Sequence, residues 1–262
     1  MKAKIFLDEE MPKVPRGSVE KVVRAAGMDV ATRNPDIGIV VGGDGVFSRF
    51  GRTESIPLLF VGVKSGLATG SKAYLASASF DELPKVLPEI AAGNYTVKRS
   101  RRLEVKKRGR NLGSVFTDVY LQRGAESNCI RYKLSVIGAR SFEEAAIGDG
   151  VVVTTAAGST GYYSYLEKLH GEVLDPTGHR VLGEDQIGVC HIVPTYSVRM
   201  GTGEHPLRYA LPWGSRVEIS VTRPADARLY GVGSGRGGVS VASGEKIVVL
   251  PSGKTTSIIS LR

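Results

Sequence analysis

Hydrophobic and polar positions alternate between strand-like and helix-like patterns over roughly the first 95 residues. Apolar runs predict short strands at Lys4–Leu7, at 36–42 and at Leu58–Val63. Between the first two, Ser18 is a candidate cap for a helix whose apolar positions fall on one face, with Gly27 as its stop. Alternating strands and helices joined by short links predict a parallel sheet covered by helices.

A second helix is predicted after the third strand. Ser79 and Glu82 have the spacing of a capping box, and apolar residues follow them at helical spacing. Pro88 lies inside this pattern and is expected to kink the helix. Residues 1–95 are therefore predicted to form one α/β domain.

After Gly93 the pattern changes to one strand after another, punctuated by glycines and prolines at hairpin spacing. One helix is expected to interrupt the strands, around Ser159–Leu169. We predict a mostly β, sandwich-like domain over residues 96–262. Its candidate strands are Leu103–Lys107, Ser114–Leu121, Ile130–Val136, Val151–Thr155, Val189–Val193, Arg216–Val221, Val239–Val241 and Ile247–Leu250.

The composition of the chain favours anionic ligands but does not distinguish nucleotides, phosphates and nucleic acid. The chain has 262 residues, 42% of them hydrophobic, and a formal charge of +9 that favours anionic ligands. It shows no apolar run of membrane-spanning length and no signal-peptide pattern, and its two cysteines have no disulfide or metal spacing. We expect a protein of the reducing cytoplasm that binds no membrane.

The strand at 36–42 ends in Gly42-Gly43-Asp44-Gly45. Glycines allow a sharp turn and a close approach to a ligand, and bare amides in such a turn can bind phosphate oxygens. An aspartate there would repel phosphate unless it binds a metal ion or takes a proton from the group being phosphorylated. The alternative is an ordinary turn with a solvated aspartate.

A second candidate stretch runs from Gly148 to Tyr163. An apolar strand ends in small and hydroxyl-bearing residues, and the predicted helix begins at Ser159 or Thr160. Amides at a helix start, together with hydroxyl groups, suit an anion or the hydroxyls of a ribose. The alternative is a simple helix cap with Tyr162 and Tyr165 packed in the core.

Other features favour structure over chemistry. The basic run Lys98–Arg110 lacks interleaved aromatic residues, which favours a solvated hairpin, with phosphate contact as second choice and nucleic acid last. Gly233–Gly238 has dinucleotide-motif spelling but precedes a strand pattern, and Gly66–Lys72 matches a P-loop only loosely. The histidines lack zinc-ligand spacing, and His191 is expected to pack in a strand.

These motifs, in this order, resemble those of the NAD kinases, whose superfamily also holds diacylglycerol and sphingosine kinases. The resemblance rests on Gly42-Gly43-Asp44-Gly45, Arg102–Val105, Phe116–Val119 with Arg123-Gly124, and Asp149-Gly150 through Gly158-Ser159-Thr160-Gly161-Tyr162. It covers roughly Gly38 to Ser252, and the predicted α/β and β layout is that family's architecture.

The resemblance implies transfer of a phosphoryl group from ATP, another nucleoside triphosphate or polyphosphate to the 2′-hydroxyl of NAD, with Mg²⁺ or another divalent cation. Asp44 would accept the hydroxyl proton or bind the metal ion. It also implies a homodimer or homotetramer. Phosphate and nucleotide contacts are assigned to Gly42, Gly43, Gly45 and Arg49, and NAD contacts to Thr117, Asp118, Asp149, Thr160, Gly161, Tyr162 and Tyr165.

Several positions depart from the family pattern. Thr117 replaces an Asn whose amide can both donate to and accept from adenine, and Tyr230 replaces an Asp. Further departures are Val46 for Thr, Lys64 for Asn and Ala156-Ala157 for Pro-Thr. A missing polar partner in a buried site can shift specificity by orders of magnitude. A kinase of this fold with another hydroxyl acceptor, and a nucleotide-binding protein without turnover, therefore stay open as alternatives.

Overall fold

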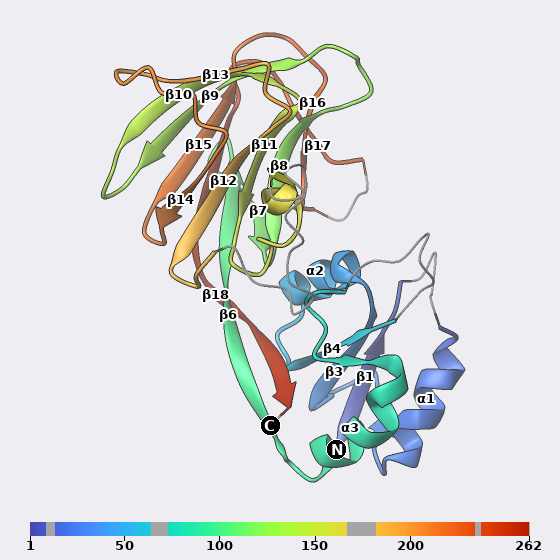
Figure 1. The fold of residues 1–262 in the computed structure, drawn as a ribbon. Coiled ribbons are helices and arrows are strands. Elements are labelled where there is room, and N and C mark those ends of the chain that lie inside the picture. Colours follow the sequence, from blue (N-terminus) through green and yellow to red (C-terminus); the bar gives the residue numbers. More distant parts are fainter. Residues whose placement is uncertain (9–13, 64–72, 167–181, 234–236, 262) are drawn as a thin grey trace. The chain divides into compact units, whose positions relative to one another are not determined.

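The chain folds into two compact units, Met1–Ser100 with Thr255–Arg262 and Arg101–Lys254. The computed structural model describes residues 1–8, 14–63, 73–166, 182–233 and 237–261 (Figure 1). The sequence prediction divided the chain between residues 95 and 96 and gave all later residues to the second domain. The structure differs because the last strand returns to the first unit, where Ile258 pairs with Leu58.

The first unit is a parallel sheet with helices. The sheet order is β2-β1-β3-β4, with β5 and the end of β18 also pairing with β4. Every residue of β3 and β4 is buried, which explains why both strands are continuous apolar runs. The elements are β1 (Lys2–Phe6), α1 (Arg16–Ala25), β2 (Asp29–Val30), β3 (Ile37–Gly42), α2 (Asp44–Thr53), β4 (Leu58–Gly62), β5 (Ala78–Ser79), a 3₁₀ turn (Phe80–Glu82) and α3 (Leu83–Ala91).

The helices of this unit differ in part from the prediction. Helix α1 begins at Arg16, directly after Pro15, so Ser18 lies inside the helix and is not its cap. The predicted stop is confirmed, because α1 ends at Ala25 and Gly27 takes φ = 74°. The capping box of Ser79 and Glu82 is present, but it opens a 3₁₀ turn that leads into α3.

The second unit is built almost entirely of antiparallel strands in two sheets, which confirms the sandwich-like class. One sheet has the order β13-β10-β9-β15-β18 with the β6–β7 hairpin, and the other has the order β14-β12-β11-β8-β16-β17. The strands are β6 (Tyr95–Lys107), β7 (Arg110–Val115), β8 (Asp118–Arg123), β9 (Ile130–Ile137), β10 (Phe142–Gly148), β11 (Gly150–Thr154), β12 (Gln186–Ile192), β13 (Tyr196–Arg199), β14 (Arg208–Pro212), β15 (Arg216–Val221), β16 (Ala227–Tyr230), β17 (Val239–Val241) and β18 (Lys246–Leu261).

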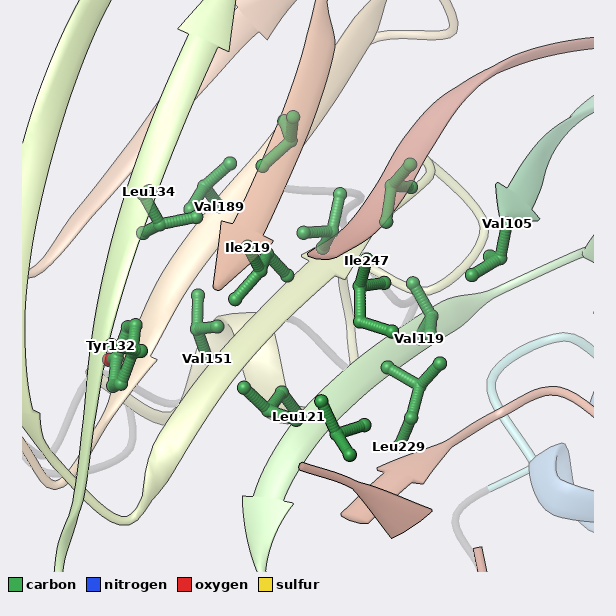
Figure 2. Close-up of a cluster of buried hydrophobic side chains, with 14 of the residues drawn as sticks. Val105, Val119, Leu121, Tyr132, Leu134, Val151, Val189, Ile219, Leu229 and Ile247 are labelled. Atoms are coloured by element: carbon green, nitrogen blue, oxygen red, sulfur yellow. The ribbon is translucent and has the colours of Figure 1, made fainter. Parts of the chain in front are cut away.

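Alternate side chains of these strands fill one apolar core. Strand β9 shows the pattern most clearly, because Ile130, Tyr132, Leu134 and Val136 are buried while their neighbours are less so. Side chains from both sheets meet in this cluster, among them Val151 from one sheet and Ile219 from the other (Figure 2). The cluster anchors strands β8 and β11, and the predicted site residues Asp118 and Asp149 lie at the start of β8 and directly before β11.

The basic run forms the β6–β7 hairpin, as its alternation predicts. Its turn uses left-handed backbone at Arg108 and Gly109. Lys107 and Arg108 form ion pairs with Glu245 at 2.9 and 2.7 Å, and Lys106 pairs with Glu104 at 2.8 Å. These contacts favour the structural interpretation of this stretch over binding of nucleic acid.

Candidate functional site

The glycine turn at residues 42–45 joins β3 to α2, a helix that the sequence analysis did not predict. Gly43 caps the helix with extended backbone, and Asp44 is its first residue. A Cβ atom at Gly42 would lie 2.8 Å from a methyl group of Val46, so close packing requires glycine there. Gly45 is exposed and has no such constraint.

Asp44 is held by backbone groups of its own unit. Its Oδ1 accepts a hydrogen bond from the Leu75 amide at 3.0 Å, and Oδ2 accepts one from the Tyr74 amide at 3.2 Å. Strand β1 lies between β2 and β3 in the sheet. The order of the strands along the chain therefore reverses direction between β1 and β3. Ligands of open α/β sheets bind beyond the carboxyl ends of strands at such a switch point. The structure therefore fixes a carboxylate where such a fold binds its ligand.

Arg49 lies on the same helix, one and a half turns beyond Asp44. It is exposed, and its guanidinium sits 5.4 Å from the centre of the Phe50 ring. Val46 and Phe47 fall between them, and Phe47 stacks on Phe60 at 4.8 Å to fix the helix on the sheet. Lys64 and the stretch Gly66–Lys72 lie outside the described residues.

In the second unit, the predicted strand Ser114–Leu121 is interrupted at Phe116 and Thr117. The Thr117 carbonyl accepts hydrogen bonds from the Thr155 amide at 2.8 Å, from Thr155 Oγ1 at 3.1 Å and from Thr154 Oγ1 at 3.2 Å. A Cβ atom at Gly158 would lie 2.6 Å from the Thr117 carbonyl carbon. These contacts bind the turn at residues 156–161 tightly against Thr117.

The helix predicted from Ser159 does not begin there. Residues 156–161 form turns, a 3₁₀ turn follows at Tyr162–Ser164, and residues 167–169 lie outside the described part of the chain. The hydroxyl groups donate to nearby carbonyl groups, from Ser159 to Ala156 at 2.8 Å and from Ser164 to Thr160 at 2.9 Å. Turn residues that satisfy their own backbone explain the missing helix start.

Asp118 begins β8 and lies beside this turn. Thr117 Oγ1 donates to its Oδ1 at 3.3 Å, and a Cβ atom at Gly161 would lie 3.4 Å from Oδ2. Burial raises the pKa of Asp118 to about 6, against the opposing effect of the Thr117 hydroxyl. Part of the side chain stays accessible. Ionisation of Asp118 is thus unfavourable in the folded protein compared with that of an exposed carboxyl group.

Three tyrosines gather next to Asp118, of which only Tyr162 is among the predicted site residues. Tyr120 and Tyr230 are directly opposite on β8 and β16, with ring centres 5.2 Å apart and planes 20° apart. Tyr162 contacts Tyr120 at 5.3 Å and remains 46% exposed. Burial, followed by the charge of Asp118, raises the pKa of Tyr120 to about 12. An exposed ring beside a carboxylate suits a nitrogen heterocycle, which offers a face to stack and an amine to bind.

Asp149 lies at the other end of the same strand pair. Thr154 of β11 pairs with Asp118, whereas the Asp149 carbonyl accepts from the Arg123 amide at 2.9 Å. Arg123 Nε also contacts Asp149 Oδ1 at 2.7 Å. Arg123 follows Asp118 by five positions along β8, which corresponds to roughly 16 Å at the rise of an extended strand. The two acids therefore lie at opposite ends of this strand pair.

Each unit also contains a hollow among its described residues. Tyr165 donates to the His191 carbonyl at 3.2 Å and helps to line an apolar cavity of about 180 Å³. That cavity is bordered by Val152, Tyr162, Tyr165, Cys190, Ile192 and Val193. In the first unit a hollow of about 460 Å³, which does not include Asp44, is bordered by Lys4, Ile5, Phe6, Leu7, Asp8, Arg16, Phe50 and Glu54.

The structure thus brings Thr117, Asp118, Gly161 and Tyr162 together and places Asp149 at the far end of β11. Within the described residues, no group of three or more His, Cys, Asp and Glu side chains could hold a metal ion. No helix among them is long and apolar enough to cross a membrane. Tyr120 is a candidate site residue that sequence reasoning missed, because only the strand register reveals its position beside Tyr230.

Comparison with known proteins gives a consistent result. No family model matches the chain. The NAD kinase of Magnetococcus marinus is 28% identical over 232 residues, 86% of this chain and 68% of the relative, and that of Thermoplasma volcanium is 25% identical over 97% of this chain and 80% of the relative. A 32% match to the Methanopyrus kandleri NAD kinase spans less than half of either chain, 48% of this one and 44% of the relative. The chain is therefore similar to NAD kinases, over most of its length at 25–28% identity.

Solved structures of NAD and NADH kinases share the fold. An NAD kinase from Archaeoglobus fulgidus in complex with ATP superposes with a TM-score of 0.68 at 18% identity, covering 100% of this chain and 94% of that one. Yeast NADH kinase complexed with NADH gives a TM-score of 0.70 at 16% identity, covering 99% and 82%. The fold class predicted from the sequence, an α/β part followed by a mostly β part, is therefore that of these solved kinases.

Proposed function

We propose that this protein is an NAD kinase, which transfers the terminal phosphoryl group of ATP to the 2′-hydroxyl of the adenosine ribose of NAD. Its similarity to curated NAD kinases supports a phosphotransferase that acts on a hydroxyl group. One observation carries the choice of acceptor: Asp118 with its tyrosines and Asp149 with Arg123 lie roughly 16 Å apart along one strand pair. That separation suits an extended molecule with two polar ends, such as a dinucleotide.

The first unit is assigned the phosphate chemistry. The ribose oxygen forms a bond to the terminal phosphorus, the bond from that phosphorus to the bridging oxygen breaks, and ADP leaves. Asp44 accepts the proton of the attacking hydroxyl, in an orientation fixed by the amides of Tyr74 and Leu75. The helix start at Asp44 adds a positive end of the helix dipole near the phosphates.

A divalent cation fits this arrangement. Mg²⁺ is commonly held by one or two carboxylates together with substrate phosphates, and Asp44 is this chain's candidate ligand. Such a cation would neutralise charge on the transferring phosphoryl group. Gly42, Gly43, Gly45 and Arg49 are the proposed contacts to the nucleotide phosphates. None of these assignments requires a metal site built from the protein alone.

The second unit is assigned the acceptor. Asp118 and Thr117 would accept from and donate to the adenine and its ribose, and Tyr162 would stack on the base. Thr160 and Gly161 form the turn beside Asp118, and Tyr165 supports that turn through the His191 carbonyl. Asp149 would bind the hydroxyls of the second ribose.

The ATP bound to the Archaeoglobus fulgidus enzyme supports ATP as donor, with polyphosphate as the alternative. We expect a homodimer or homotetramer in the cytoplasm, which size-exclusion chromatography and cell fractionation would test.

The proposal is tested by assaying NADP formation from NAD, Mg²⁺ and ATP with wild-type protein and with Asp44→Asn. We expect turnover to fall by at least about a hundredfold, because the neutral amide cannot take the proton. Asp36→Asn is a matched control, since the Asp36 carboxylate also accepts a backbone hydrogen bond, from Lys2 at 2.7 Å. Near-normal activity of Asp44→Asn would contradict the mechanism.

A second outcome would favour a different acceptor. Tyr230 places a second ring against Tyr120 where the family resemblance expects an acid, so the acceptor side has changed. If wild-type protein forms no NADP but its melting temperature rises with ATP or NAD, the fold has kept its nucleotide site. Phosphorylation of another nucleoside or sugar hydroxyl would then identify a kinase with a different acceptor, and its absence would identify a nucleotide-binding protein.

A further inference from the structure

A polar network lies buried between the two sheets of the second unit. Glu144 of β10 and His191 of β12 are almost completely buried, with exposed fractions of 1% and 0%. Tyr209 Oη donates to Glu144 Oε2 at 2.8 Å, and Nε and Nη2 of Arg199 both contact Glu144 Oε1 at 3.0 Å. His191 Nε2 lies 3.3 Å from Glu144 Oε2. The network therefore joins both sheets through one carboxylate.

The other nitrogen of His191 continues the network towards the predicted acceptor site. His191 Nδ1 lies 2.8 Å from Tyr132 Oη, which in turn donates to the Gly150 carbonyl at 2.7 Å. A carbonyl oxygen only accepts, so the single hydroxyl proton of Tyr132 goes to Gly150. His191 Nδ1 is hydrogen-bonded to the same Tyr132 oxygen. Burial raises the pKa of Tyr132, which keeps this phenol a donor at neutral pH.

Gly150 directly follows Asp149, and the backbone here has little freedom. Gly150 takes φ = 151°, and a Cβ atom on it would lie 1.9 Å from the Leu121 carbonyl oxygen. The Asp149 amide donates to the Ile192 carbonyl at 2.9 Å. The peptide groups around Asp149 are thus hydrogen-bonded to three strands: to the Arg123 amide of β8, to the Tyr132 hydroxyl of β9 and to the Ile192 carbonyl of β12.

A buried charged network is an inefficient way to stabilise a protein, because desolvation offsets most of the attraction between the charges. Apolar side chains could fill the same space between the sheets. The chain of contacts from Glu144 through His191 and Tyr132 ends on the Gly150 carbonyl. The contacts therefore act on one place in the backbone, where they fix the orientation of the Asp149–Gly150 turn.

We propose that Tyr132, oriented by His191 and Glu144, is a positioning residue that fixes the Asp149 turn for binding of the acceptor. The role of Asp149 in this statement rests on the proposed function, in which Asp149 binds the second ribose of a dinucleotide. Tyr132 does not touch the acceptor. It acts through the Gly150 carbonyl, and the loss of its hydroxyl leaves that carbonyl free to tilt.

The network offers a matched pair of variants. Tyr132→Phe and Tyr209→Phe each delete one phenolic hydroxyl from the same network, but only Tyr132 contacts Gly150. We expect similar losses of melting temperature. We expect the KM for NAD to rise about three- to tenfold in Tyr132→Phe alone, the factor that one hydrogen bond contributes, with kcat and the KM for ATP unchanged.

Hydrogen exchange of the peptide that contains Asp149 and Gly150, measured by mass spectrometry, gives a readout that needs no turnover. We expect faster exchange there in Tyr132→Phe and not in Tyr209→Phe. Equal KM values in wild type and Tyr132→Phe, or equal changes in both variants, would overturn the positioning role. If wild-type protein fails to use NAD, the proposed function fails, and the exchange rates alone decide for or against Tyr132.

Discussion

Asp118 is expected to reduce the stability of the folded protein at neutral pH. Its pKa rises from the ordinary value of 3.8 to about 6, chiefly because burial disfavours the charged form. The native state therefore holds the proton more tightly than the unfolded state does. Stability is lost as the pH rises from about 4 to 6, and the full cost is present above pH 6.

The size of the effect follows from the shift. A difference of about two pKa units corresponds to about 3 kcal/mol, and the partial exposure of the side chain reduces this to about 1–2 kcal/mol. Asp118→Asn removes the charge while its Oδ1 can still accept from Thr117. We expect the variant to be more stable than wild type at pH 7 by that amount, a rise of a few degrees in melting temperature.

Urea unfolding of both proteins between pH 4 and pH 8 measures the difference. The stability gain of Asp118→Asn should be near zero at pH 4 and should grow through pH 6. Asp81→Asn, which removes an exposed carboxylate, controls for the change in net charge. The variant should also bind NAD more weakly. A stability difference that does not vary with pH, or a variant less stable at pH 7, would refute the assignment of a costly buried charge.

Two further predictions concern packing in the second unit. Gly150→Ala should lower the free energy of unfolding in urea by more than about 3 kcal/mol, because its Cβ would lie 1.9 Å from the Leu121 carbonyl oxygen. Gly17→Ala in α1 is the control and should be neutral or stabilising, because the space around Gly17 is open. Tyr230→Phe should keep the stack on Tyr120 and near-wild-type stability, whereas Tyr230→Ala should lose about 2 kcal/mol or more. Equal urea midpoints for the two Tyr230 variants would show that the ring stack contributes nothing.

Strands could be predicted from the sequence where their signal is local. The buried run of β3 and the alternation of β9 each identify an element within a few residues. Helix α2 could not be predicted in the same way. It carries Gly45 and Gly51, which weaken helix propensity, and it is held by the stack of Phe47 on Phe60. That contact depends on the tertiary fold.

The candidate site shows the same division. Asp44 is visible in the sequence because it follows an apolar strand that ends in glycines, whereas Asp118 and Asp149 are assigned through the resemblance to NAD kinases. The Tyr120–Tyr230 pair depends on the register between β8 and β16, which local patterns do not specify. Glu144 and His191 are 47 residues apart, and a lone histidine in a strand pattern predicts only packing. Residues that act through contacts across the sheets therefore remained invisible to sequence reasoning.

The departures from the family pattern affect the edges of the site more than its framework. Thr117 supports the turn at residues 156–161 through its main-chain carbonyl, which accepts from Thr154 and Thr155. Any residue can supply that carbonyl, so an Asn or a Thr leaves the turn in place. What changes is the side chain, since the Thr117 hydroxyl is directed at Asp118. Substitutions at Thr117 should therefore alter the choice and affinity of the acceptor while leaving the fold and the chemistry of Asp44 intact.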